Sequence, residues 1–138
     1  MKIEHYNNLL ELFYNQYKQE RSGQVFLQSL KDPNQKFTWK QTYLNILKLS
    51  DQLESLMQNH DRCLLISENR PEWMLSDLAI MLANGITVPA YTTYTERDYE
   101  YLIDDCEPSV IIVSDKTCLL YTSPSPRDLS TSRMPSSA

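Results

Sequence analysis

The sequence predicts an α/β fold: a βαβαβ unit of a doubly wound parallel sheet, preceded by helices and a hairpin. Three short apolar runs, at residues 62–66, 86–88 and 109–114, alternate with two stretches of helical periodicity. Short links between alternating strands and helices imply parallel pairing with right-handed crossovers. The third run is apolar at successive positions, which is typical of a strand covered on both faces.

Composition narrows the class of protein. The 138 residues allow one modest domain, and 41% hydrophobic with 22% charged residues is ordinary globular usage. The net charge of -5 disfavours a nucleic-acid-binding platform. The start of the chain lacks a signal-peptide pattern, and the longest apolar stretch, Leu78 to Ala83, cannot cross a bilayer. We therefore expect a cytoplasmic protein, and peripheral membrane contact stays open.

The first elements lie outside the βαβαβ unit. Apolar residues at helical spacing predict a helix over residues 4–21, which Ser22-Gly23 ends. Residues 25–30 and 36–37 predict two strands around the turn at residues 32–35. Thr38 and Gln41 form a capping box, which starts a helix that runs to about Gln58.

The remaining elements complete the alternation. After the strand at 62–66, Pro71 suits the first turn of a helix that is apolar nearly all round and therefore buried, with a stop at Asn84-Gly85. Pro89 is expected to end the strand at 86–88. Thr95 and Asp98 offer the cap of a helix that continues through Glu107.

Ligands of such sheets bind beyond the carboxyl ends of the strands. Those ends are residues 67–69, 90–93 and 114–115, so Ser67, Asn69 and Tyr91 could border a ligand. Structural roles are favoured for all three: backbone hydrogen bonds for Ser67 and Asn69, and partly buried packing for Tyr91.

The sequence contains little that could carry chemistry. Only two glycines, Gly23 and Gly85, occur, so a glycine-rich phosphate loop is excluded. The wide spacing of the cysteines favours reduced thiols and gives no zinc ligand set. The remaining candidates are predicted to be solvated: His5, His60, Asp104, Asp105 and Glu107. We accordingly predict no catalytic, cofactor-binding or metal-binding residue.

The composition changes after about Thr117. Residues 118–138 are rich in Ser, Thr and Pro and show neither helical nor strand periodicity. One interpretation is a disordered tail. The string CLLYTSPSPRD at residues 118–128 also resembles a translated sequencing adapter, which favours a non-native extension. Residues 1–117 are then the domain.

Three stretches together carry a family resemblance. They read SENRPEW at residues 67–73, ANGITVPAY at 83–91 and YLIDDCEPSVIIV at 101–113. This pattern resembles the N-terminal part of AMP-forming acyl-CoA synthetases, best the long-chain fatty acid–CoA ligase branch, over roughly residues 25–115. One departure is Tyr91-Thr92-Thr93, where the family commonly has Tyr-Pro-Thr.

The resemblance implies the sheet of an adenylate-forming enzyme and a two-step reaction. A fatty acid and ATP would give an acyl-adenylate, and CoA would then form a thioester, with Mg²⁺ neutralising the phosphates. The family's phosphate loop, ribose-binding aspartate and C-terminal lysine have no counterpart here, and Tyr94-Thr95-Glu96 matches its adenine-side motif at the wrong place. We therefore expect an inactive N-terminal fragment that binds neither ATP, Mg²⁺ nor CoA. A small α/β binding or receiver-like module is one alternative, and a non-catalytic adaptor built on the front part of such a ligase is another. The oligomeric state is not predicted.

Overall fold

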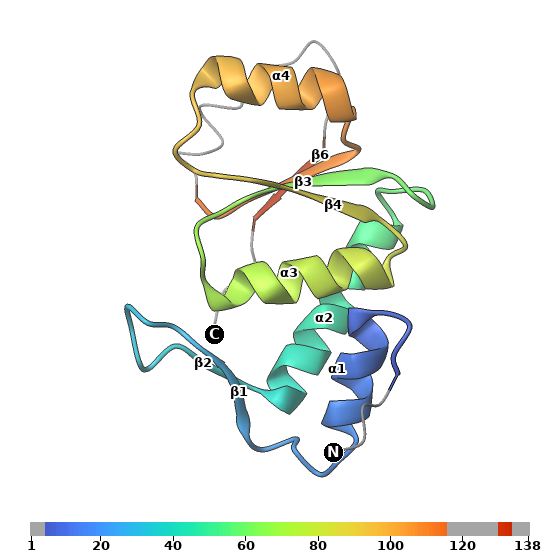
Figure 1. Cartoon of the computed structure of the whole chain (residues 1–138), viewed down its shortest axis with the longest axis vertical. Coiled ribbons are helices and arrows are strands. Elements are labelled where there is room, and N and C mark those ends of the chain that lie inside the picture. The colour runs from blue at the N-terminus through green and yellow to red at the C-terminus, as the bar shows by residue number, and fades with distance from the viewer. Residues whose placement is uncertain (1–4, 116–129, 134–138) are drawn as a thin grey trace.

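The computed structural model describes residues 5–115 and 130–133, and these form a layered α/β structure (Figure 1). A central sheet has helix α4 on one side and α3 on the other, and α1, α2 and a two-stranded hairpin lie beyond α3. The elements in chain order are α1 (Leu9–Tyr17), β1 (Val25–Gln28), β2 (Lys36–Thr38), α2 (Trp39–Glu54), β3 (Arg62–Ile66), α3 (Pro71–Leu82), β4 (Ile86–Ala90), α4 (Glu96–Cys106), β5 (Val110–Val113) and β6 (Ser130–Arg133).

The central sheet has the strand order β4-β3-β5-β6, and every neighbouring pair is parallel. Alternate residues of β3 and β5 enter two different cores. Cys63, Leu65, Val110 and Ile112 pack toward α2 and α3. Leu64, Ile66, Ile111 and Val113 pack with Tyr99 and Ile103 of α4. Helices cover both faces, so the predicted doubly wound α/β class is confirmed.

Strand β4 is longer than the sequence analysis predicted. Pro89 does not end it but lies inside it, in register with Leu65 of β3, and the strand continues to Ala90. Among the described strands β4 lies at an edge of the sheet. A proline is tolerated there because an edge strand needs no N–H donor on its outer side.

The turn between α3 and β4, at Asn84 and Gly85, departs from the usual helix end, in which the glycine has positive φ. Asn84 takes the left-handed conformation, with φ of 60°, whereas neither glycine has positive φ. A Cβ at Gly85 would lie 2.8 Å from Met57 Cε and 3.1 Å from Ile80 Cγ2. Gly85 is therefore required by close packing and not by backbone conformation.

The hairpin and the capping box are confirmed, with smaller differences at the helix ends. Strands β1 and β2 pair antiparallel, and the Thr38 and Gln41 side chains satisfy each other's backbone N–H at 3.0 and 2.9 Å. Helix α1 is shorter than the predicted span of residues 4–21. It starts later because Asn8 caps it by accepting from Glu11 N at 2.9 Å, and it ends earlier, at Tyr17. Helix α2 ends at Glu54 and not near Gln58.

The segment after residue 115 is described only at residues 130–133. Contrary to the absence of strand periodicity, these residues form β6, in parallel register with β5. Residues 118–129 and 134–138 lie outside the described residues, so the predicted nature of this segment is not tested there. Within the described residues, every helix is too short or too polar to traverse a bilayer.

Candidate functional site

A pocket lies at the carboxyl ends of β3 and β4, where the sequence analysis placed the border of a ligand site. Its volume is about 290 Å³, and its lining comprises Ser67, Asn69, Trp73, Pro89, Ala90 and Tyr91. Two of the three predicted strand ends therefore share one pocket. The third follows β5 beside β3, with Ser114 N donating to Ile66 O at 3.0 Å, but does not line it.

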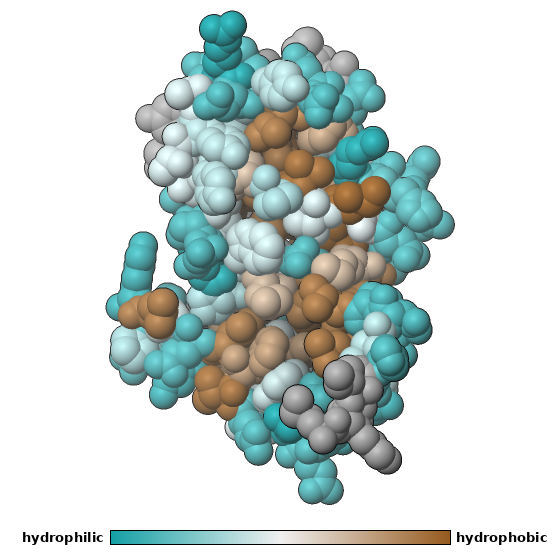
Figure 2. Space-filling view, in the orientation of Figure 1, coloured by the Kyte–Doolittle hydropathy of each residue, from teal (hydrophilic) through white to brown (hydrophobic). Residues whose placement is uncertain are grey.

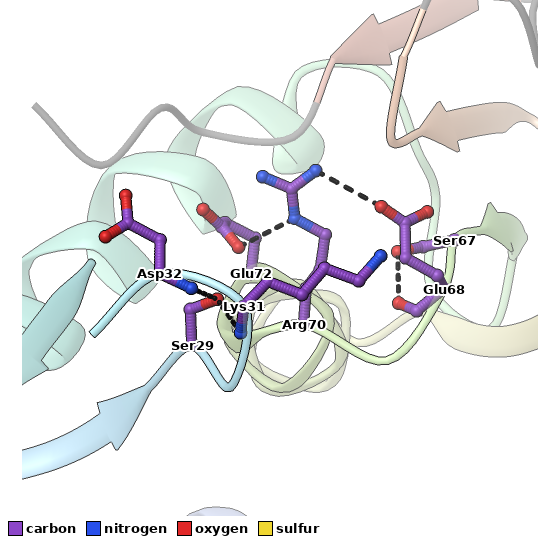
Figure 3. A network of polar contacts seen from close by, with 7 residues as sticks. All are labelled: Ser29, Lys31, Asp32, Ser67, Glu68, Arg70 and Glu72. Carbon is purple, nitrogen blue, oxygen red and sulfur yellow. Dashed lines mark hydrogen bonds and ion pairs between the residues drawn. The ribbon is translucent and has the colours of Figure 1, made fainter. Parts of the chain in front are cut away.

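Charged side chains brace the loop between β3 and α3, which forms one wall of this pocket (Figure 3). Arg70 Nε donates to Glu72 Oε2 at 2.8 Å, and Arg70 Nη1 lies 3.5 Å from Glu68 Oε1. Glu72 is only 1% exposed. The hydrogen bond to Glu72 raises the pKa of Arg70, and this guanidinium therefore stays charged. A buried carboxylate therefore holds this loop.

The sequence predicted the structural role of Ser67 correctly and the burial of Tyr91 wrongly. Ser67 is buried, and its Oγ donates to the Glu68 carbonyl at 2.7 Å, which confirms a structural role. Tyr91 was predicted to be partly buried, but this is wrong: it is 68% exposed. Asn69 is also exposed and lines the pocket. Tyr91 directly follows β4, which lies at an edge of the sheet among the described strands.

An aromatic cluster fixes the loop after β4. The buried Tyr99 donates its hydroxyl to the Tyr91 carbonyl at 2.6 Å. The Tyr94 ring lies 5.5 Å from that of Tyr91 and 5.9 Å from that of Tyr99. The sequence analysis missed Tyr99 as a positioning residue. Its helical spacing with Ile103 and Cys106 indicates a core position, but no local pattern indicates the partner of its hydroxyl.

The other candidate residues lie where the sequence analysis expected. His5, His60, Asp104, Asp105 and Glu107 are exposed. Thr95 caps α4, so Tyr94-Thr95-Glu96 serves a helix start. Cys63 and Cys106 are buried free thiols, and burial raises the pKa of Cys63 to about 12. Cys118 lies outside the described residues.

Within residues 5–115 and 130–133, no three His, Cys, Asp or Glu side chains gather to hold a metal ion. Asp61 lies before β3 and accepts from Gln58 N and Ser109 Oγ at 2.8 and 2.7 Å. These bonds lower the pKa of Asp61. The carboxylate thus joins loops at the opposite end of the strand from the pocket.

Comparison with known proteins decides the family. The family model described as "AMP-binding enzyme" matches residues 13–135, most of the chain. The chain belongs to the AMP-binding enzyme family. This match extends past residue 117, although the nature of residues 118–138 stays a prediction. The resemblance drawn from the three sequence stretches is thereby confirmed at the level of the family.

Curated relatives include long-chain fatty acid–CoA ligases. The chain is 29% identical over 84 residues to ligase ACSBG2 of Gallus gallus, covering 59% of this chain and 11% of the relative. It is 33% identical over 81 residues to a long-chain-fatty-acid–CoA ligase of Bacillus subtilis, covering 58% and 14%. This AMP-binding family chain therefore spans only about a tenth to a seventh of these relatives.

Solved structures show the same fold at low sequence identity. The anthranilate CoA ligase AuaEII, in complex with anthranoyl-AMP, gives a TM-score of 0.71 at 22% identity, covering 87% of this chain and 23% of that one. The N-terminal subdomain of Klebsiella oxytoca NpsA gives 0.71 at 18% identity, covering 91% and 30%. The fold is thus that of adenylate-forming enzymes, and a receiver-like module has no support from these likenesses.

Proposed function

We propose that this chain is the N-terminal part of an AMP-forming long-chain fatty acid–CoA ligase. The observation that carries the proposal is the family match over residues 13–135, together with long-chain ligases among the aligned relatives. In the proposed reaction the fatty carboxylate attacks the α-phosphorus of ATP, which forms an acyl-adenylate and releases pyrophosphate. The thiol of CoA then attacks the acyl carbon, forms the thioester and releases AMP.

The described residues do not fit ATP or Mg²⁺, so no step is assigned to them. A phosphate-binding loop needs clustered glycines, and the chain has two that lie far apart. The carboxylates also do not gather into a metal-binding set within the described part of the chain. What these residues supply is a covered parallel sheet and a pocket at its carboxyl edge. We therefore propose that the 138-residue chain is inactive alone.

ATP–pyrophosphate exchange tests both parts of the proposal. The longer protein that contains residues 1–115 should exchange labelled pyrophosphate into ATP only when a long-chain fatty acid is present. The 138-residue chain, assayed at the same concentration, should give no exchange above the fatty-acid-free control. Exchange by the short chain would refute its proposed inactivity. Exchange by the longer protein that does not depend on a fatty acid would refute the ligase assignment.

The domain limits belong to the same proposal. We place the partial AMP-binding domain at residues 1–117 and a non-native or disordered extension at 118–138, in a protein located in the cytoplasm. Independent sequencing of the source transcript tests the boundary. A reading frame that departs from this sequence after about residue 117 would support a non-native extension. The same 118–138 sequence in independent reads would contradict it.

A further inference from the structure

Helices α1 and α2 meet through two stacked aromatic pairs. Phe13 stacks on Trp39, with ring centroids 5.4 Å apart and an interplanar angle of 27°. One helical turn further along each helix, Tyr17 stacks on Tyr43, with centroids 4.6 Å apart and an angle of 16°. Phe13 is 7% exposed and belongs to the core, and Figure 2 shows apolar side chains gathered over this half of the molecule. The buried pair therefore holds the two tyrosine rings beside each other.

The Tyr17–Tyr43 pair is the closest pair of tyrosine rings in the part of the chain that the structure describes. The Tyr14 ring lies 6.1 Å from that of Tyr43 and 6.4 Å from that of Tyr17. Tyr91 and Tyr94 are 5.5 Å apart, but their rings are nearly perpendicular, at 83°. Tyr17 and Tyr43 are both half-buried, so solvent still reaches them.

A neighbouring cation disfavours oxidation of Tyr14, the third tyrosine of this cluster. Lys18 Nζ lies 4.8 Å from the centre of the Tyr14 ring. The attraction depends on the electron-rich face of that ring, so removing an electron from Tyr14 is disfavoured. The stacked rings of Tyr17 and Tyr43 can instead share the charge that is left when one electron is removed. The pair is therefore the favoured place for an oxidised tyrosine in this cluster.

We propose that Tyr17 and Tyr43 form an oxidative cross-linking site, at which hydrogen peroxide and a haem peroxidase join the two rings as dityrosine. Each phenol gives one electron and one proton to the oxidant and becomes a tyrosyl radical. The two radicals couple through a bond between their Cε atoms, and the proton that each Cε then loses is replaced by one on its phenol oxygen. The pair loses two hydrogen atoms in all, and hydrogen peroxide is reduced to two waters.

The geometry suits this bond. The centroid distance of 4.6 Å is already close to that of two directly bonded rings, so rotation of the side chains brings the Cε atoms together. The bond ties the end of α1 to α2 and encloses the hairpin in a covalent loop. Because a cross-link constrains the unfolded chain more than the folded one, the cross-linked protein resists denaturation better. The inference does not depend on the ligase reaction.

Treatment of the 138-residue chain with hydrogen peroxide and a haem peroxidase, at low protein concentration, tests the site. Cys118→Ser is the background, since its remaining cysteines are buried. Trypsin cleaves after Lys and Arg, which places Tyr17 in the peptide 3–18 and Tyr43 in the peptide 41–48. Mass spectrometry of the monomer should find these peptides joined and lighter than their sum by two hydrogen atoms. The cross-linked monomer should also unfold at a higher urea concentration.

Two substitutions in α1 give a matched pair. Tyr17→Phe keeps the ring and removes the reacting phenol, so the joined peptide should be lost, as it should in Tyr43→Phe. Tyr14→Phe alters the same tryptic peptide and should retain the joined product, as should Tyr101→Phe at an exposed position of α4. Circular dichroism should show that all variants are folded.

Three outcomes would overturn the proposal. One is the absence of the joined peptide from the treated monomer. Another is a product that survives in Tyr17→Phe and disappears in Tyr14→Phe. The third is an equal yield of the joined peptide when the chain is oxidised in urea, because the bond would then not depend on the stacked arrangement.

Discussion

Glu72 shows how one buried carboxylate can organise a pocket wall. It is 1% exposed, and its hydrogen bond to Arg70 is 2.8 Å long. In Glu72→Gln the charge-assisted bond is lost while the side-chain shape is kept. Because Arg70 is itself partly exposed, the free energy of unfolding should fall by only about 1–2 kcal/mol in urea denaturation. Glu68→Gln is the control. Its longer contact, 3.5 Å, is partly solvated, so a loss equal to that of Glu72→Gln would contradict this account.

Gly85 provides a second test at the scale of a residue. A methyl group there would meet Met57 Cε at 2.8 Å and the Ile80 carbonyl at 3.3 Å. The flexible Met57 can move, but the backbone of α3 cannot, so Gly85→Ala should lower the free energy of unfolding by about 1–2 kcal/mol. Gly23→Ala is the matched control, because nothing lies within 4 Å of its added Cβ. The free energy of unfolding of that variant should be unchanged or slightly higher. Equal stability of the two variants would refute the packing role.

The residue scale also shows where sequence patterns fail. Asn84-Gly85 correctly marked the end of α3, yet Asn84 and not the glycine has positive φ. The exposure of Tyr91 depends on which neighbours reach the edge of the sheet, and the hydroxyl contact of Tyr99 spans a turn of the chain. Such details follow from spatial neighbours, which a periodicity does not contain.

At the scale of the element, the start of α4 makes stability sensitive to acid. Asp98 accepts from Thr95 N at 2.9 Å, and this bond lowers the pKa of its carboxyl below the ordinary 3.8. A lowered folded-state pKa gives a contribution that is present above the unfolded-state pKa and lost as the pH falls through the folded-state value. The free energy of unfolding should therefore fall as the pH drops below about 4–5.

Asp98→Asn tests this acid sensitivity by chemical denaturation at several pH values. The variant should depend less on pH below about 4–5 than the unaltered chain, because the amide does not titrate. Asp104→Asn, at an exposed position of the same helix, is the control. An unchanged pH dependence in Asp98→Asn would show that the carboxylate does not contribute.

Elements were predicted better than their ends. The span of β3 and the caps of α2 and α4 are confirmed, because alternation and capping chemistry are local. Strand β4 was predicted too short, since whether a proline is tolerated depends on the strand being at an edge. Strand β6 was not predicted at all, because backbone pairing with β5 needs no apolar alternation in Ser130–Arg133.

At the scale of the whole molecule, the reactivity of the Cys63 thiol measures how often the folded core opens to solvent. It is a fully buried residue of β3, and burial raises its pKa to about 12. In a variant with Cys106→Ser and Cys118→Ser, Cys63 should react with a thiol reagent at pH 8 at least about 100-fold more slowly in the folded chain than in urea. Prompt labelling of the folded chain would mean that the core opens easily or is not formed.

The sequence by itself determined the α/β class, the order of the main elements and the family. These follow from periodicity, caps and motifs that act within a few residues of one another. Only the tertiary structure decided the shared pocket at residues 67–73 and 89–91 and the apolar groove between α1, the hairpin and α3. Each of these needs segments that are distant in sequence to meet, and the free energy of such contacts depends on burial and distance that local patterns do not specify.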